Sequence, residues 1–340
     1  MHLVIQNIIP EISSEIEANR QIRAFDLFCG AGGSSFGAYR AGVTIVGGVE
    51  RWALAADTYE DNFDGAVVYR NDIRKLRPED IGEEHGRIDL LIASPECTNH
   101  TVAKGKGRKT REAEISRETA FEVVRFAAAL KPKWVVVENV IQMRQWRRYQ
   151  EWLTKMCALG YKHSEQILNA ADFGVRQTRK RLFILFSKES KPEIILPSVK
   201  SRRNIKPALD MNGRYTYSLL KTRNRAKPTL ERADRAKAEL GPKQSFLLVY
   251  YGSDGAGGWQ RLSSPLRTIT TIDRFALVKW ENGRYRMRML QVPELRQAMG
   301  FPDSFRFEKG TRRDKIAMLG NGVCPPVMEH IVRTLTSKVR

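Results

Sequence analysis

The sequence has few cysteines, and their spacing argues against two classes of protein. It contains four, with no C-x-x-C pair among them: Cys29, Cys97, Cys157 and Cys324. Structural zinc sites and small disulfide-bonded domains depend on closely spaced cysteines. We therefore expect no metal site and a reducing, cytoplasmic environment.

Long apolar runs are also missing. No stretch of about eighteen apolar residues occurs, so we expect no membrane span. Residues 1–20 contain Glu11, Glu15 and Glu17 and lack the basic start and apolar run of a secretory signal. We expect an N-terminal extension there rather than a signal peptide.

Positive charge, in contrast, is abundant. Lys and Arg total 58 of the 340 residues against 38 Asp and Glu, which gives a formal net charge of +20. Two stretches concentrate it: Lys104–Arg111, which has no acidic residue, and Val199–Lys237. Each phosphate that such a patch neutralises releases counterions. The charge therefore favours a nucleic-acid partner over the alternative, a basic protein that binds no polyanion.

Apolar runs alternate with helical patterns over the first half of the chain. Six runs predict buried strands: Ile22–Phe28, Val43–Val49, Val67–Tyr69, Ile88–Ala93, Trp134–Val137 and Leu182–Phe186. Helical spacing or composition predicts helices over Glu118–Leu130 and Trp152–Leu159. Strands that alternate with helices imply an α/β fold with a doubly wound, mostly parallel sheet.

The composition changes near Pro192, where Pro, Arg, Asn and Lys become frequent. We expect a catalytic domain at 21–190 and a smaller, irregular domain at 191–285, which includes the Gly-rich stretch Tyr250–Trp259. The segment 286–340 is expected to return to the catalytic domain, with helices at Val292–Met299 and after Asn321.

Each unusual residue of the first half follows a predicted strand. A glycine-rich turn follows the first strand, and the next four lead to Glu50, Asp72, Cys97 and Glu138. Ligands of doubly wound sheets bind beyond the carboxyl ends of the strands. The pattern therefore predicts an active site at this edge.

The turn Asp26–Gly37 lets backbone approach a ligand closely. It is not a dinucleotide fingerprint, because Ser35 stands where the third Gly belongs, and taken alone it fits a structural turn equally well. Glu50 follows Gly30 by 20 residues, where a carboxylate accepts hydrogen bonds from ribose hydroxyls. With Asp72 as an acceptor for an adenine amino group, the three features indicate an adenosyl ligand without a diphosphate.

Six short motifs in this order resemble the cytosine-5 DNA methyltransferase family of bacteria and phages: Asp26–Gly37, Ser94–Cys97, Glu138–Val140, Gln177–Arg181, Met299–Asp303 and Gly320–Pro326. The resemblance covers nearly the whole chain except 1–20 and 191–285. It implies a Rossmann-like catalytic domain that uses S-adenosyl-L-methionine to methylate C5 of cytosine in double-stranded DNA. The domain at 191–285 would then recognise the target sequence, which the chain itself does not reveal.

The resemblance also implies the chemical roles. Cys97 would add to C6 of a flipped-out cytosine, so that C5 gains the electron density to accept the methyl group. Glu138 would supply a proton near N3, which requires surroundings that raise its pKa. Arg179 is expected to contact O2 of the base, with Arg181 beside it. Each residue also has a simpler interpretation: Cys97 as a small core residue, Glu138 as a helix cap at the strand end, and the two arginines as partners of phosphate or of structural groups.

Further contacts follow from the same resemblance. The expected cofactor contacts are Asp26, Phe28, Gly30, Gly32, Gly33, Glu50, Trp52, Asp72, Ile73, Ser94, Asn321 and Val323. The expected DNA contacts are Lys104, Lys106, Arg108, Lys109, Arg176, Gln177, Arg223, Arg225 and Trp259. A monomer would suffice, and family habit suggests a companion restriction endonuclease.

The chain departs from the family beside the nucleophile. Glu96 replaces the usual Pro before Cys97, and Thr98 replaces the usual Gln after it. A carboxylate against the sulfur would raise the pKa of the thiol and slow its attack. We therefore predict that the Glu96 side chain turns away. Arg176 also stands where the family often has Pro, and Cys324 receives no role.

Two rival functions stay open. One is a tRNA cytosine-5 methyltransferase, although that branch normally keeps a Pro-Pro-Cys motif and a Cys-Phe-Thr segment that are missing here. The other is a DNA-binding homologue that no longer catalyses, which Glu96 suggests. The presence of Cys97, Glu138 and Arg179 argues against it.

Overall fold

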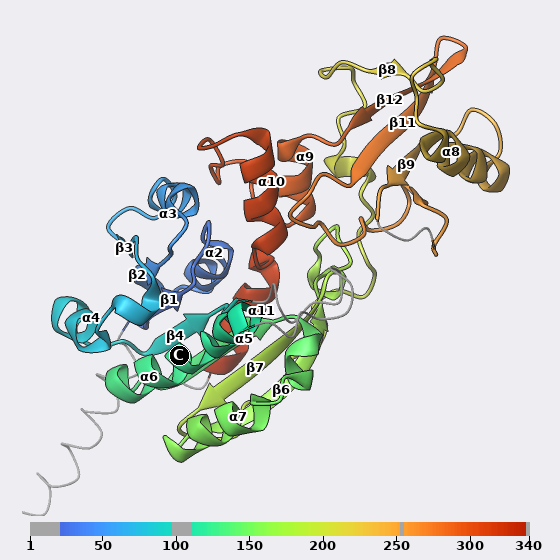
Figure 1. Cartoon of the computed structure of the whole chain (residues 1–340). Helices are drawn as coiled ribbons and strands as arrows, with labels where there is room; N and C mark the ends of the chain where they lie inside the picture. The colour runs from blue at the N-terminus through green and yellow to red at the C-terminus, as the bar shows by residue number, and fades with distance from the viewer. Residues whose placement is uncertain (1–20, 97–110, 252–254, 338–340) are drawn as a thin grey trace, which may run out of the picture. The chain divides into compact units, whose positions relative to one another are not determined.

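The computed structural model describes residues 21–96, 111–251 and 255–337. The chain divides into two compact units (Figure 1). Unit 1 takes in the chain up to Ile167, then Arg181–Leu196 and the residues from Val327 on, and unit 2 consists of Leu168–Lys180 and Pro197–Pro326. This division by compactness differs from the expected domains, which stay a prediction: 168–180 and 286–326 belong to unit 2.

Unit 1 is built on a seven-stranded sheet with the order β3-β2-β1-β4-β5-β7-β6. The strands are β1 (Arg23–Leu27), β2 (Thr44–Val49), β3 (Val67–Tyr69), β4 (Leu90–Ala93), β5 (Trp134–Asn139), β6 (Lys162–Asn169) and β7 (Lys180–Ser187). Strands β1 to β5 pair in parallel, and β7 runs antiparallel to β5. The expected α/β fold with a mostly parallel sheet is confirmed.

Helices cover both faces of this sheet, as they must where strands are buried on two sides. They are α2 (Gly33–Arg40), α3 (Ala53–Glu60), α4 (Pro78–His85), α5 (Arg111–Glu118), α6 (Ala120–Leu130), α7 (Tyr149–Ala158) and α11 (Pro325–Thr336). Among the described residues, short 3-10 turns occur in unit 1 at η1 (Ile73–Lys75) and η3 (Ile141–Gln145), and in unit 2 at η4 (Ala170–Phe173) and η5 (Lys206–Ala208).

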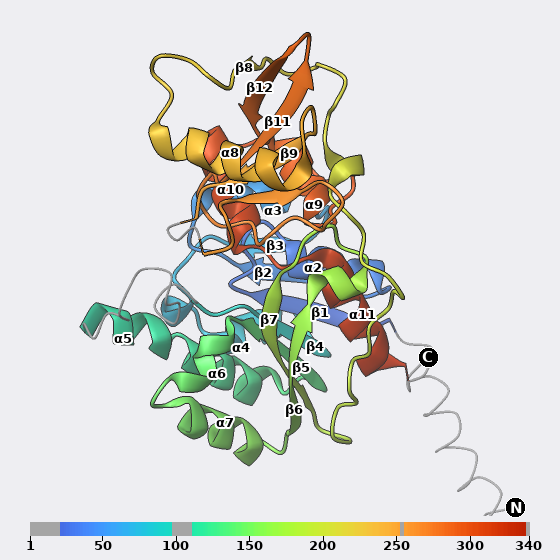
Figure 2. The same cartoon turned by 90° about the vertical axis from the view of Figure 1, so that its right-hand side faces the viewer.

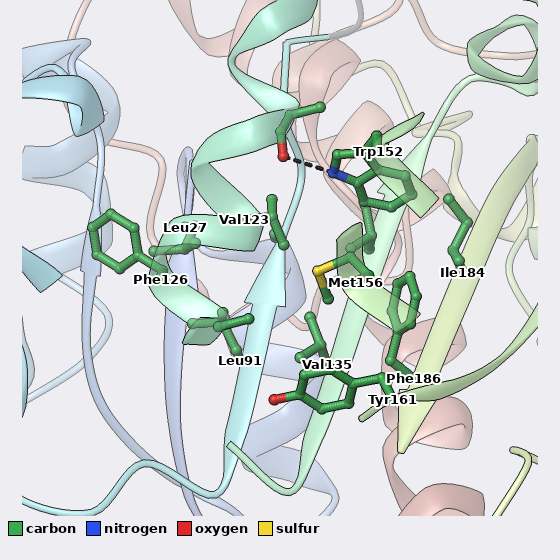
Figure 3. Close-up of a cluster of buried hydrophobic side chains, with 14 of the residues drawn as sticks. Leu27, Leu91, Val123, Phe126, Val135, Trp152, Met156, Tyr161, Ile184 and Phe186 are labelled. Carbon is green, nitrogen blue, oxygen red and sulfur yellow. Dashed lines mark hydrogen bonds between the residues drawn. The ribbon is translucent and has the colours of Figure 1, made fainter. Parts of the chain in front are cut away.

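The main core lies between the sheet and helices α4, α6 and α7 (Figure 3). Leu91 and Val135 of the sheet meet Phe126 of α6 and Trp152 of α7, all of them fully buried. Trp152 also donates its indole N–H to the backbone oxygen of Ala120, 2.8 Å away, so its polar atom is satisfied. Each such side chain stabilises the fold by about 1.5–3 kcal/mol through burial.

Helices α2 and α11 lie on the other face of the sheet (Figure 2). Arg333 of α11 donates to the backbone oxygen of Arg40 at the end of α2, and Arg40 pairs with Glu329 at 3.1 Å. These contacts bring α11 beside α2, although nearly three hundred residues separate Arg333 from Arg40 in sequence.

Unit 2 contains a second sheet, with the order β10-β9-β11-β12-β8 and antiparallel pairing. Its elements are β8 (Ser218–Leu219), α8 (Lys227–Leu240), β9 (Phe246–Val249), β10 (Trp259–Arg261), β11 (Phe275–Glu281), β12 (Arg284–Met289), α9 (Val292–Ala298) and α10 (Arg312–Asn321). Ala233 and Ala236 of α8 pack on Phe246 and Val278.

The sequence did not predict the antiparallel sheet within 191–285, and the burial and length of its strands explain why. Strand β9 is buried at all four residues and β11 at its first five, so neither shows the alternation of a half-exposed strand. Strands β8 and β10 have only two and three residues, too few for a recognisable pattern.

A buried ion pair joins β12 to α9 within unit 2. Arg288 donates two hydrogen bonds to the carboxylate of Glu294, at 2.6 and 2.8 Å, and both side chains are 3% exposed. Glu294 also accepts from the backbone N–H of Asp210 and of Gln291. The carboxylate is thus bound on both oxygens, as a charge in a core requires.

Candidate active site

The carboxyl ends of five strands of unit 1 meet at one edge of the sheet. Leu27 of β1 pairs with Val49 of β2 and with Ala93 of β4. Val49 pairs in turn with β3 and Ala93 with β5, so the five strands end side by side. The residues at or just after these strand ends therefore gather at the same edge, and they include most of the expected site residues: Phe28, Gly30, Glu50, Trp52, Asp72, Ile73, Ser94 and Glu138.

Glu50 connects the first two strand ends. One carboxylate oxygen accepts the backbone N–H of Gly30 at 3.0 Å, and the other accepts that of Trp52 at 2.8 Å. Burial raises the pKa of Glu50, and the two backbone hydrogen bonds oppose that rise. Each oxygen keeps a lone pair, so the carboxylate can accept further hydrogen bonds from a ligand.

Asp26 lies buried at the base of the glycine-rich turn. Its Oδ2 accepts the hydroxyl of Ser35 at 2.7 Å, and Ser35 in turn accepts the hydroxyl of Tyr59. Oδ1 is buried and, among the described residues, has no hydrogen-bond partner. Burial raises the pKa of Asp26 to about 7.

The turn itself has a left-handed backbone at Phe28, Gly30 and Gly32, and Gly33 begins α2. A Cβ on Gly32 would come within 2.4 Å of the Phe63 ring, so packing demands glycine there. At Gly30 a Cβ would meet no atom within 4 Å. The turn is thus open at Gly30, where a ligand can approach the backbone.

The remaining expected cofactor residues have mixed surroundings. Asp72 caps η1 and is ion-paired with Arg74, which holds the pKa of Asp72 down to about 2. Ile73 is buried, and within the described chain the hydroxyl of Ser94 is buried without a partner. Asn321 and Val323 belong to unit 2, where Asn321 is exposed and Val323 is buried.

An unpartnered buried acceptor, an open glycine and a carboxylate anchored by two N–H groups occur together at this edge. These features fit an adenosyl ligand that carries hydroxyl and amino donors.

Glu138 is the buried acid at the end of β5. It is 6% exposed, and Nε of Arg181 on β7 lies 3.2 Å from its Oε1. The antiparallel register, in which Glu138 faces Phe183, brings Arg181 close to this strand end. Cys97 lies outside the described residues, as do Lys104, Lys106, Arg108 and Lys109.

Asn139 is a positioning residue that sequence reasoning did not single out. Its side-chain amide donates to the backbone oxygen of Pro95 at 3.1 Å, and its oxygen accepts the N–H of Val140. It thereby ties the end of β5 to the chain just before Cys97. The sequence feature that could have identified Asn139 is its place in the Glu138–Val140 motif.

The other arginine motif residues lie in unit 2. Arg179 is buried and donates to the backbone oxygens of Ile269 at 3.1 Å and Gly320 at 2.8 Å. Gln177 is fully buried and accepts the N–H of Ile269. Arg176 donates to the oxygen of Asn204. All three hold unit 2 together, and their expected base and DNA contacts stay a prediction.

A hollow of about 600 Å³ in unit 2 is lined by basic and aromatic side chains, among them Arg235, Trp259, Gln260, Arg261 and Arg267. The guanidinium of Arg261 lies 5.7 Å from the centre of the Trp259 ring. Of these residues, only Trp259 was expected from the sequence.

The other two expected arginines of this unit differ from each other. Arg223 is exposed, whereas Arg225 donates to the backbone oxygens of Leu219 and Leu220. In the part of the chain that the structure describes, no group of acidic, histidine and cysteine residues could hold a metal ion, and no helix is long and apolar enough to cross a membrane.

Comparison with known proteins gives a consistent result. The family model described as C-5 cytosine-specific DNA methylase matches residues 22–337. The Type II methyltransferase M.FnuDI of Fusobacterium nucleatum is 26% identical over 345 residues, which cover 93% of this chain and 96% of that protein. M.HindV of Haemophilus influenzae is 28% identical over 187 residues, 55% of this chain and 60% of the relative. The chain thus spans less than two thirds of some relatives that it matches.

Solved structures share the fold at low sequence identity. A DNA modification methyltransferase encoded within a prophage of E. coli has a TM-score of 0.66 at 20% identity and covers 93% of this chain and 99% of its own. The Dnmt2 methyltransferase of S. pombe has a TM-score of 0.66 at 16% identity, with 94% and 100% covered.

Proposed function

Because the chain belongs to the C-5 cytosine-specific DNA methylase family, we propose that it methylates C5 of cytosine within a specific site of double-stranded DNA. The observation that carries this proposal is the buried Glu138–Arg181 pair, which lies at the same sheet edge as the Glu50 and Gly30 turn. Methyl transfer to a ring carbon requires an acid that protonates the base, which Glu138 would be, and a group that binds the adenosyl part of the methyl donor, which Glu50 would be.

The family uses S-adenosyl-L-methionine, which confirms the cofactor expected from the sequence. When bound, this cofactor supplies an electrophilic methyl group. Glu50 would hold its ribose hydroxyls, and Asp72 would accept from its adenine amino group. Gly30 would let it approach the backbone, and Asp26 offers an acceptor at the base of the turn.

The chain's own residues would carry the reaction at the base. The Cys97 thiolate forms a bond to C6, and the electron pair of the C5–C6 double bond moves toward C5 and N3. Glu138, in its protonated form, donates its proton at N3, and Arg181 pairs with the carboxylate that remains until N3 returns the proton. After C5 gains the methyl group, its proton leaves to a base, the double bond re-forms and Cys97 departs as thiolate.

The partners follow from the same proposal. The flipped base implies duplex DNA, and the net charge of +20 suits binding to phosphates. A monomer that acts in the cytoplasm of a bacterial, archaeal or phage-infected cell, with a companion restriction endonuclease, completes the proposal.

Nucleoside mass spectrometry tests it. Duplex genomic DNA is incubated with the protein and S-adenosyl-L-methionine, beside Cys97→Ser and the control Cys157→Ser, which alters an exposed cysteine outside the proposed site. We expect 5-methylcytosine with the wild type and the control, and none with Cys97→Ser. Methylation of tRNA but not of duplex DNA would replace the proposed substrate. Binding of DNA without methylation would indicate a silent homologue.

A further inference from the structure

We propose that Glu96 is a positioning residue, held with Arg51 and Ser116 in a three-residue clasp that fixes the chain immediately before the nucleophile. The inference rests on the proposed function. It concerns the position where this chain carries glutamate instead of the family's usual proline.

Both oxygens of the Glu96 carboxylate are occupied within the described chain. Oε1 lies 2.8 Å from a guanidinium nitrogen of Arg51, and Oε2 accepts the hydroxyl of Ser116 at 2.6 Å. Arg51 comes from the turn between β2 and α3, whereas Ser116 lies on α5. One side chain therefore connects three separate elements of unit 1.

The clasp joins residues that lie on either side of 97–110 in the sequence. Glu96 precedes Cys97, and Ser116 belongs to the helix that begins at Arg111. A proline at position 96 would restrict φ through its ring. Glutamate has no such restraint, so its side-chain contacts supply the restriction that the backbone lacks. Asn139 adds a second restraint by donating to the oxygen of Pro95.

The clasp also offsets the charge of the carboxylate. Arg51 is the direct partner of Glu96, and its positive charge also favours the ionised forms of the Glu50 and Asp72 carboxylates. Arg74, which is paired with Asp72, also interacts electrostatically with Glu96. A carboxylate paired in this way disfavours a neighbouring thiolate less than an unpaired one would.

Stability alone does not account for the arrangement. The Arg51 side chain is 62% exposed and that of Glu96 is 24% exposed. Exposed ion pairs contribute little to folding. Loss of the clasp should therefore change the rate of methyl transfer far more than the melting temperature.

Single-turnover methyl transfer tests this inference on the full chain. We expect Glu96→Ala to slow transfer by about tenfold to a hundredfold, the equivalent of one charge-assisted contact. The Kd for S-adenosyl-L-methionine should change less than about twofold, and the melting temperature should not fall. Arg51→Glu should be equally slow, and Arg51→Glu with Glu96→Arg should regain most of the rate. The control is Glu189→Ala, which removes an ion pair with Lys133 at the opposite end of β5.

A wild-type rate in Glu96→Ala would overturn the inference, as would a matching loss of cofactor affinity or melting temperature. A second readout does not require methylation: alkylation of Cys97 by iodoacetamide in a Cys157→Ser background. Arg51→Met should slow alkylation by removing the cation paired with Glu96, and adding Glu96→Ala should restore it; unchanged rates would contradict charge compensation. If the wild type forms no 5-methylcytosine while this alkylation pattern holds, the proposed function fails and not the clasp.

Discussion

Arg181 holds the buried carboxylate of Glu138, with its Nε 3.2 Å from Oε1. The two residues come from strands that run in opposite directions, and the antiparallel placement of β7 makes the contact possible. A buried carboxylate without a partner would be costly, so the arginine both permits the acid at this strand end and sets its orientation.

Replacement of Arg181 by lysine should therefore slow methyl transfer by about tenfold to a hundredfold, because an ammonium group lacks the planar donor set of guanidinium. Single-turnover rates measure this effect. Arg144→Lys, which alters an exposed pair with Glu165 in the same unit, is the matched control and should keep the wild-type rate. An unchanged rate in Arg181→Lys would mean that Arg181 does not orient the acid.

Glu50→Gln should weaken binding of S-adenosyl-L-methionine by about tenfold to a hundredfold. The amide has one acceptor oxygen, so it cannot accept both backbone N–H groups and still receive ribose hydroxyls. Isothermal titration calorimetry gives the Kd directly. Asp57→Asn, on the exposed ion pair with Arg70, serves as the control. Equal affinity of Glu50→Gln and the wild type would remove Glu50 from the cofactor site.

Asp26 should make stability depend on pH. Its pKa is raised from 3.8 to about 7 in the folded protein, mainly by burial, so the folded state keeps a proton that the unfolded chain loses. The free energy of unfolding therefore falls as pH rises from about 4 to about 7, by up to about 4 kcal/mol at about 1.4 kcal/mol per pKa unit.

Asp26→Asn lacks this titration. The stability of the variant relative to the wild type should increase between pH 4 and pH 7 and stay constant above that, as measured by urea unfolding at several pH values. A difference between the two proteins that does not vary with pH would show that Asp26 is ionised in the folded state throughout.

Glu294→Ala should destabilise unit 2 by about 3–5 kcal/mol, since it leaves the guanidinium of Arg288 buried without its carboxylate. Urea unfolding monitored by tryptophan fluorescence measures the loss. Asp303→Ala removes an ion pair whose acidic side chain is 74% exposed, and it should cost less than about 1 kcal/mol. Equal effects of the two variants would contradict the argument from burial.

The sequence by itself determined six of the seven strands of the first sheet and the edge where the candidate site lies; it missed β6, whose residues are mostly half-exposed and form no apolar run. Parallel strands covered on both faces are continuous apolar runs, which a local window reveals, and Val67–Tyr69 matches β3 residue for residue. The polar residue after each run then marks the strand end. Gly320 likewise belongs to a recognisable motif, although only the structure shows that a Cβ there would come within 2.3 Å of the Thr270 backbone.

The tertiary structure alone decided the pairings that make the site specific. Arg179 and Gly320 are 141 residues apart, and Glu96 and Ser116 are 20 residues apart, so no local pattern connects them. The second sheet could not be predicted from the sequence for the same reason, because β8 pairs with β12 more than sixty residues later. The local sequence indicates whether a segment is buried, whereas the segment that it packs against depends on how the whole chain folds.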